Sequence, residues 1–166
     1  KLSKLAHDKS IPCYYDWGSG SFYQFQHSAI REYTTVGKVL SYRPDLLSFS
    51  GDKLLGGIQA GILIGKKGII EKMRNSPLYR TFRLDKVNLT LMEETLEAYL
   101  DIKSLPDQVP TVFLLEQTAE KISDKAKDFL SKIKTNNKSL WNLEIRKTVS
   151  KTGGGAMPDL NLSSSI

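Results

Sequence analysis

Short apolar stretches and helical apolar spacing alternate along the first half of the chain. Three stretches are bounded by glycine, proline or polar residues, which is typical of buried strands. Strands separated by helices, with nearly continuous apolar content, predict a mostly parallel sheet covered on both faces. The predicted strands are 11–16, 45–50 and 60–65, and the predicted helices lie near 2–6, 36–40 (ended by Pro44) and 66–75.

The pattern changes from Leu84 onward. Apolar positions between Leu84 and Leu100 follow one face of a helix of about five turns. The segment "SLPDQVP" then breaks the chain with two prolines, and a boundary near residue 103 separates an α/β lobe (1–103) from a smaller α+β lobe (104–166). The elements expected in the second lobe are an amphipathic helix from Ala119 to about Asn136, a half-buried strand over 141–146, a glycine-rich turn over 152–158, and a last strand around Leu160 and Leu162.

Composition narrows the class of protein without identifying a partner. Of 166 residues, 40% are hydrophobic and 25% charged, the profile of a soluble globular protein. No apolar run approaches the roughly 20 residues of a membrane helix. The net charge of +6 permits an anionic partner such as nucleic acid. The polar start without Met indicates a piece of a longer protein, and the single cysteine, Cys13, fits a reducing, cytoplasmic setting.

Lys53 is the first candidate for chemistry. It follows a predicted strand in "SFSGDKLLGG", and the carboxyl ends of strands are where open α/β sheets bind ligands. Gly51, Gly56 and Gly57 could let backbone approach a flat ligand or could adopt a positive φ. A neutral lysine amine can form a Schiff base with an aldehyde, and Ser50 could offer its hydroxyl to a phosphate at the same strand end. The alternative is a turn lysine that reaches into solvent.

Asp16 is the second candidate, because it ends the neighbouring predicted strand. A carboxylate there can keep a ring nitrogen protonated, although an aspartate can also simply start a turn. An aspartate and a lysine at adjacent strand ends are the two protein groups that a pyridoxal phosphate enzyme needs. The sequence indicates neither a metal site nor a nucleotide site. His7 and His27 have no HExxH motif or neighbouring Cys and His ligands, and no glycine stretch has P-loop spacing.

Arg80 and Arg83 share a face if they lie on one helical turn, where two guanidinium groups could clamp a phosphate-like anion. From the residues alone, pairing with Asp85 or plain solvation is the preferred interpretation.

Three segments in order resemble the bacterial selenocysteine synthases, the L-seryl-tRNA(Sec) selenium transferases. They are "YYDWGSG", the long stretch from "DLLSFSGDK" to "LEAYL", and "TGGGAMP". The resemblance implies a fold-type I pyridoxal phosphate transferase, similar to aspartate aminotransferase, of which this chain holds part of the large domain and a small C-terminal domain. Trp17 and Ile58 depart from the family's usual Leu and Pro.

The resemblance also implies roles. Lys53 would hold pyridoxal 5'-phosphate as a Schiff base, Asp16 would face the pyridine nitrogen, and Ser50 would lie near the phosphate. Asp52, Arg80 and Arg83 would lie near the selenium donor and the reacting serine. Seryl-tRNA(Sec), bound mainly by an N-terminal region outside this chain, would react with selenophosphate in a homo-oligomeric ring of dimers.

Two other functions stay open. Another fold-type I enzyme, such as a lyase acting on sulfur amino acids, would share Lys53 and Asp16 but would not need the arginine pair. A non-catalytic, basic tRNA-binding remnant would bind tRNA in a salt-sensitive way, would not need Lys53 and would hold no cofactor.

Overall fold

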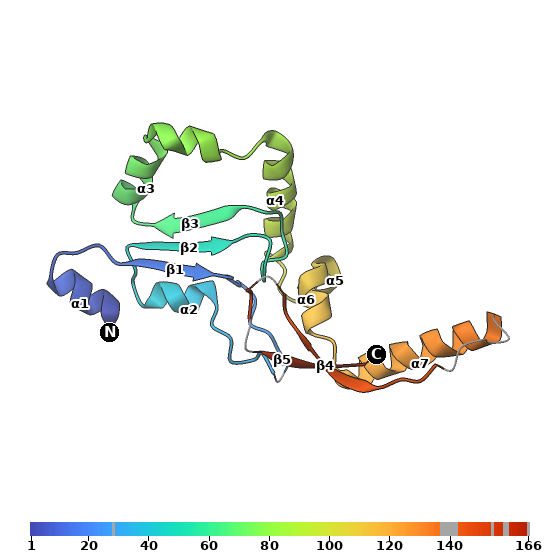
Figure 1. The fold of residues 1–166 in the computed structure, drawn as a ribbon. Helices are drawn as coiled ribbons and strands as arrows, with labels where there is room; N and C mark the ends of the chain where they lie inside the picture. The colour runs from blue at the N-terminus through green and yellow to red at the C-terminus, as the bar shows by residue number, and fades with distance from the viewer. Residues whose placement is uncertain (28, 137–142, 154, 158–159, 166) are drawn as a thin grey trace.

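The computed structural model describes residues 1–27, 29–136, 143–153, 155–157 and 160–165 (Figure 1). A three-stranded sheet lies in the first half of the chain, and a two-stranded sheet lies beside the C-terminal helix. The elements are α1 (Leu2–Asp8), β1 (Tyr14–Gly18), α2 (Val36–Ser41), β2 (Leu46–Ser50), β3 (Gly61–Gly65), α3 (Lys67–Arg74), the 3₁₀ helix η1 (Pro77–Phe82), α4 (Lys86–Ala98), α5 (Leu105–Gln108), α6 (Pro110–Leu115), α7 (Ala119–Asn136), β4 (Lys147–Lys151) and β5 (Asn161–Ser165).

The larger sheet has the order β1-β2-β3, with β1 parallel to β2 and β3 antiparallel to β2. The three predicted strands are therefore present, but the prediction of a mostly parallel sheet is wrong for the β2–β3 pair. The cause lies in the connection. The link between β2 and β3, residues 51–60, contains no helix, whereas a parallel return needs a crossover of a dozen or more residues.

Only one face of this sheet is covered by a helix in the described residues. Leu47 and Phe49 of β2 are buried against Val36 and Val39 of α2. On the opposite face Leu63 of β3 is still 40% exposed, so the expectation of two covered faces is wrong for the part of the chain described. Because side chains alternate across a strand, the polar residues of β2 point to this open face.

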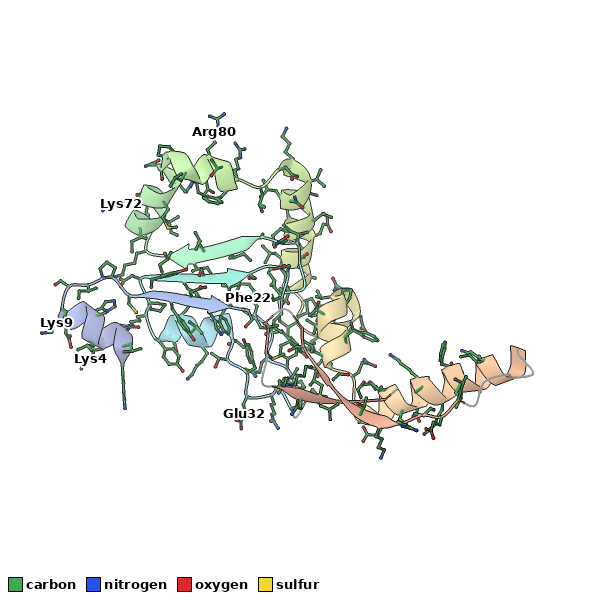
Figure 2. The ribbon with its side chains drawn as sticks, viewed as in Figure 1. Lys4, Lys9, Phe22, Glu32, Lys72 and Arg80 are labelled. Carbon is green, nitrogen blue, oxygen red and sulfur yellow. The ribbon has the colours of Figure 1, made fainter. Side chains whose placement is uncertain are left out.

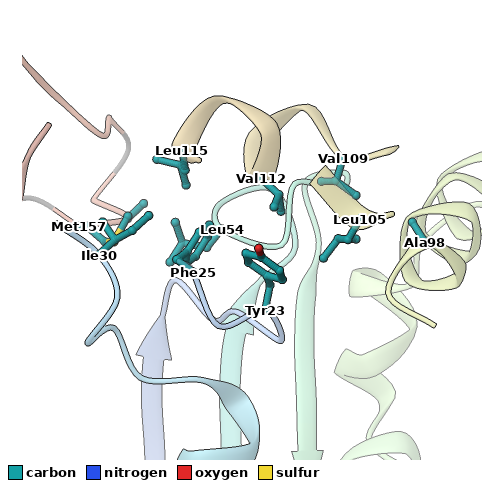
Figure 3. Close-up of a cluster of buried hydrophobic side chains, with 11 residues drawn as sticks. Tyr23, Phe25, Ile30, Leu54, Ala98, Leu105, Val109, Val112, Leu115 and Met157 are labelled. Atoms are coloured by element: carbon teal, nitrogen blue, oxygen red, sulfur yellow. The ribbon is translucent and has the colours of Figure 1, made fainter. Parts of the chain in front are cut away.

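A second and larger core lies beyond the ends of these strands (Figure 3). Leu54, from the loop after β2, packs with side chains from the loop after β1, from α4 to α6, and from the segment before β5. The two lobes expected on either side of residue 103 thus share one core, and their division into domains stays a prediction. The buried members are Tyr23, Phe25, Ile30, Leu54, Ala98, Leu105, Val109, Val112, Leu115, Ala156 and Met157.

The two prolines of "SLPDQVP" begin helices instead of ending one. Pro106 lies in the first turn of α5, and Pro110 is the first residue of α6. Proline is favoured there because the first amide groups of a helix have no partner within the helix. The expected break is therefore a pair of short helices, and they bury Leu105 and Val112 in the larger core.

The C-terminal part agrees with the prediction for α7 and for the last strand. The strand expected over 141–146 is different: residues 141 and 142 lie outside the described residues, and residues 143–146 are not in a strand. Strand β4 begins at Lys147, where antiparallel pairing with Ser165 of β5 begins. No helix in the described part is long and apolar enough to cross a bilayer.

Candidate functional site at the ends of β1 and β2

Asp16 and Lys53 both lie toward the carboxyl ends of the parallel strands β1 and β2. Asp16 lies directly opposite Ser48 in the parallel register, and Lys53 follows β2 in a turn. The Lys53 side chain reaches back to β1. Its Nζ lies 3.9 Å from the position that a Cβ at Gly18 would occupy. The amine therefore lies beside the last residue of β1, two positions after Asp16.

The Asp16 carboxylate is held by a hydrogen bond across the strand pair. Ser48 Oγ donates to Asp16 Oδ1 over 2.8 Å, and the Tyr14 hydroxyl lies 2.7 Å from the same Ser48 Oγ. Sequence analysis did not single out Tyr14 or Ser48. The signal in the sequence was a serine at the middle of an otherwise apolar predicted strand. For Asp16 Oδ2 the described residues provide no hydrogen-bond or ion-pair partner.

The Lys53 amine is similarly available. Its residue is half-buried, and no hydrogen bond or ion pair of its Nζ is found among the described residues. The two following residues, Leu54 and Leu55, are buried, and Leu54 packs in the larger core. Ser50, the last residue of β2, points to the same open face as Ser48, and Asp52 is exposed beside Lys53.

The glycines after β2 serve the packing of helices. A Cβ at Gly51 would lie 2.6 Å from Met92 Cε of α4 and 2.9 Å from the Ile58 carbonyl oxygen. A Cβ at Gly56, whose φ is +75°, would lie 2.6 Å from Val109 Cγ1. Gly56 thus has the positive φ that was one of its two expected roles. The space at both glycines is filled by the close approach of α4 and of the start of α6.

Backbone hydrogen bonds and aromatic rings hold this loop in place. Gly51 N–H donates to Ala60 O, and Gly57 N–H donates to Gly51 O, each over 2.8 Å. The Tyr99 hydroxyl of α4 donates to Leu55 O over 2.8 Å, and burial raises the pKa of this phenol. The ring of Phe22 meets Tyr99 edge-on at 5.9 Å, so the loops after β1 and β2 are joined through α4.

Arg80 and Arg83 are not part of this cluster. Arg80 lies on η1 and Arg83 ends it in an extended conformation, so the two residues do not share a regular helical turn. Both are exposed, and Figure 2 shows Arg80 pointing away from the sheet. Pairing with Asp85 is absent from the described residues, because both Asp85 oxygens accept hydrogen bonds from Asn88 as the cap of α4.

The opposite end of the sheet carries a carboxylate that sequence analysis missed. Asp45 is buried, and its Oδ2 accepts from Cys13 N–H at 2.7 Å and from His7 Nε2 at 2.9 Å, while Oδ1 pairs with Lys66. The hydrogen bond from Cys13 and the contact with Lys66 hold the pKa of Asp45 well below its usual range. These bonds tie the start of β2 to the segments before β1 and α3.

The strand-end cluster has the parts for imine chemistry. The Lys53 amine, the Asp16 carboxylate with one free oxygen and the Ser50 hydroxyl all lie toward the carboxyl ends of β1 and β2. In the described ranges no three His, Cys, Asp or Glu side chains gather to hold a metal ion.

Known sequences with the same pattern identify the family. A family model described as L-seryl-tRNA selenium transferase matches residues 1–166, the whole chain. The chain belongs to this family. The L-seryl-tRNA(Sec) selenium transferase of Maridesulfovibrio salexigens is 36% identical over 162 residues, which are 98% of this chain and 35% of that protein.

Other transferases of the family agree. The same-named protein of Alkaliphilus oremlandii is 38% identical over 166 residues, 100% of this chain and 35% of its own length. That of Nautilia profundicola is 38% identical over 159 residues, 96% of this chain and 34% of its own length. The chain thus spans about a third of the length of these selenium transferases.

Proposed function

We propose that this chain is part of a pyridoxal phosphate-dependent enzyme that converts seryl-tRNA(Sec) to selenocysteinyl-tRNA(Sec) with selenophosphate. Family membership supports the reaction class, and the names of the relatives supply the tRNA substrate. The observation that carries the proposal is the approach of Lys53 Nζ to the end of β1, two residues from Asp16. We infer that the full-length protein works in the cytoplasm as a homo-oligomer.

The cluster fits the cofactor by the chemistry of its groups. Lys53 would bind the aldehyde carbon, because its amine has no competing partner among the described residues. Asp16 would hold the ring nitrogen through the oxygen that Ser48 leaves free. Ser50 would lie toward the phosphate. When bound, pyridoxal phosphate supplies a ring that accepts electrons from the substrate α-carbon.

The proton transfer would belong to Lys53. When its amine is not bonded to the cofactor, Lys53 could take the seryl α-proton at Nζ. The turn that carries Lys53 is fixed by the burial of Leu54 and Leu55, so the amine stays near the reacting carbon. The exposed Asp52 lies next to it and would face the substrate side of the site.

The decisive experiment is Lys53→Ala in the full-length protein, with Lys72→Ala of the exposed α3 helix as the matched control. Wild type and the control should show the visible absorption band of lysine-bound cofactor, and borohydride should fix the cofactor on the Lys53 peptide. Lys53→Ala should lose both signals and at least a hundredfold of activity. A wild type that stays colourless in excess cofactor, or an adduct on another lysine, would exclude the proposal.

The arginines require a separate argument. Since Arg80 points away from the sheet that carries Lys53, we infer that Arg80 and Arg83 act at the site of a neighbouring copy (Figure 2). Their fixed positive charges would bind the anionic selenium donor, which is a role for two guanidinium groups that have no partner among the described residues.

Mixed oligomers test this inference. Full-length Lys53→Ala and the double variant Arg80→Ala/Arg83→Ala should each lose at least about a hundredfold of activity. Co-expressed with two different tags and purified through both, they should regain part of it, because one copy supplies the lysine and the other the arginines. Doubly tagged oligomers that remain as inactive as either variant would contradict the inference.

A further inference from the structure

Ser48 occupies a special place among the groups around Asp16. It lies directly opposite Asp16 in the β1–β2 register, and Tyr14 is two residues before Asp16 on the same strand. Two-residue alternation places Tyr14 and Asp16 on one face, and Ser48 meets both there. This is the open face of the sheet, where Leu63 of the neighbouring strand is also opposite Ser48.

The direction of the hydrogen bonds follows from the groups. An ionised carboxylate can only accept, so the Ser48 hydroxyl donates its single hydrogen to Asp16 Oδ1. The Tyr14 hydroxyl must then donate to Ser48 Oγ over the 2.7 Å that separates them. The result is a chain of donors from Tyr14 through Ser48 to Asp16, in which each bond strengthens the next.

We propose that Ser48 is a positioning residue that, with Tyr14, orients the Asp16 carboxylate for the cofactor ring nitrogen. This inference rests on the proposed function. One oxygen of Asp16 is occupied by Ser48, which fixes the rotation of the carboxylate and leaves Oδ2 for a ligand. Asp16 is exposed, so without this bond its side chain would have to be ordered when the cofactor binds, at a cost in affinity.

A purely structural role is a poor explanation for this chain of hydrogen bonds. The bonds of Ser48 to both neighbours lie at an exposed site, and exposed polar contacts add little to stability. An apolar residue at position 48 would extend the apolar surface formed by Leu46 and Leu63 on the same face. A serine at this place is therefore better explained by what it does to Asp16.

The test is the affinity for pyridoxal phosphate in the full-length protein. Ser48→Ala should weaken binding about five- to tenfold, which is within the range of one ordinary hydrogen bond. Ser48→Thr keeps the hydroxyl and should stay within about twofold of wild type, and Tyr14→Phe should lose about twofold. Ser41→Ala removes an exposed hydroxyl that donates to Lys38 O in α2, and it is the matched control that should bind like wild type.

A double-mutant cycle separates positioning from packing. If Ser48 acts through Asp16, Ser48→Ala should have no further effect on cofactor affinity in the Asp16→Asn background. The urea midpoint of Ser48→Ala should equal that of wild type. An equal loss in both backgrounds, or wild-type affinity for Ser48→Ala, would overturn the inference, while a wild type that never bonds Lys53 to the cofactor would overturn the proposed function instead.

Discussion

The two aspartates at opposite ends of β1 and β2 have opposite surroundings. Asp45 is 4% exposed, and both of its oxygens have partners from three other residues. Asp16 is exposed, and Ser48 occupies only one of its oxygens. A buried carboxylate must be fully paired because an unpaired one costs much free energy, whereas a carboxylate that binds a ligand needs a free oxygen.

Within one small sheet, the paired Asp45 holds segments together, whereas the open Asp16 is able to bind a ligand. At the Asp45 end, a backbone amide, an imidazole and an ammonium group join three segments that are distant in sequence. At the Asp16 end, the Lys53 amine lies beside Gly18, two residues after Asp16, and neither the amine nor the second carboxylate oxygen has a partner among the described residues. Neighbouring charges that remain available to a ligand are the stronger sign of a binding site.

The largest loss of stability should therefore come from Asp45→Asn and not from Asp16→Asn. The amide of asparagine keeps only one acceptor oxygen, so its NH2 group must face either Cys13 N–H or Lys66, and that donor loses its acceptor. Asp16→Asn should stay within about 0.5 kcal/mol of wild type, because its side chain is exposed. Urea unfolding of the two full-length variants at neutral pH measures the difference.

The dependence of the unfolding free energy on acid pH provides a second test of Asp45. Its folded-state pKa is lowered by Cys13 and Lys66, so its contribution is complete above the unfolded value of about 3.9 and is lost as the pH falls below it toward the folded value. Wild type should lose stability in that window, and Asp45→Asn should lose less. Equal slopes for the two proteins below pH 4 would show that the unfolded chain keeps the same contacts.

The parts of the site that were predicted depend on local rules. The strands were visible as apolar runs closed by polar residues, and the parallel pairing of β1 with β2 agrees with the prediction. The prediction that Asp16 ends its strand is wrong, because β1 continues to Gly18. The Tyr14–Ser48–Asp16 hydrogen bonds were not predictable in this way. They depend on the exact register between strands that lie thirty residues apart, and a single step of slippage would turn Ser48 to the other face.

The errors in the fold have two physical sources. Antiparallel β3 and the short helices that begin with proline follow from local features, the short connection over residues 51–60 and the position of proline in a first helical turn. The later start of β4 depends on pairing with a more distant segment, β5. The glycines near Lys53 show the same effect. Their sequence suggested room for a ligand, but the space at Gly51 is filled by Met92, which lies about forty residues further along the chain.

The smallest expected effect concerns the loop that carries Lys53. Gly51→Ala places a Cβ against Met92 Cε and the Ile58 carbonyl oxygen, so the loop must shift, at a cost of about 1–3 kcal/mol. Gly61→Ala is the matched control on the adjacent strand, because nothing lies within 4 Å of its added Cβ, and it should change stability by less than about 0.5 kcal/mol.

The affinity for pyridoxal phosphate measures whether this shift of the loop changes the position of Lys53. Met92 ends in a flexible thioether that can move aside, but the Ile58 carbonyl belongs to the backbone of the same loop and cannot. Met92 is buried, so Met92→Ala removes core packing of its own. We therefore expect Gly51→Ala/Met92→Ala to be no more stable than Gly51→Ala, and both variants to bind pyridoxal phosphate more weakly than wild type. Full recovery of stability and affinity in the double variant would mean that the loop is held by α4 alone, and that the position of Lys53 does not depend on the backbone contact at Ile58.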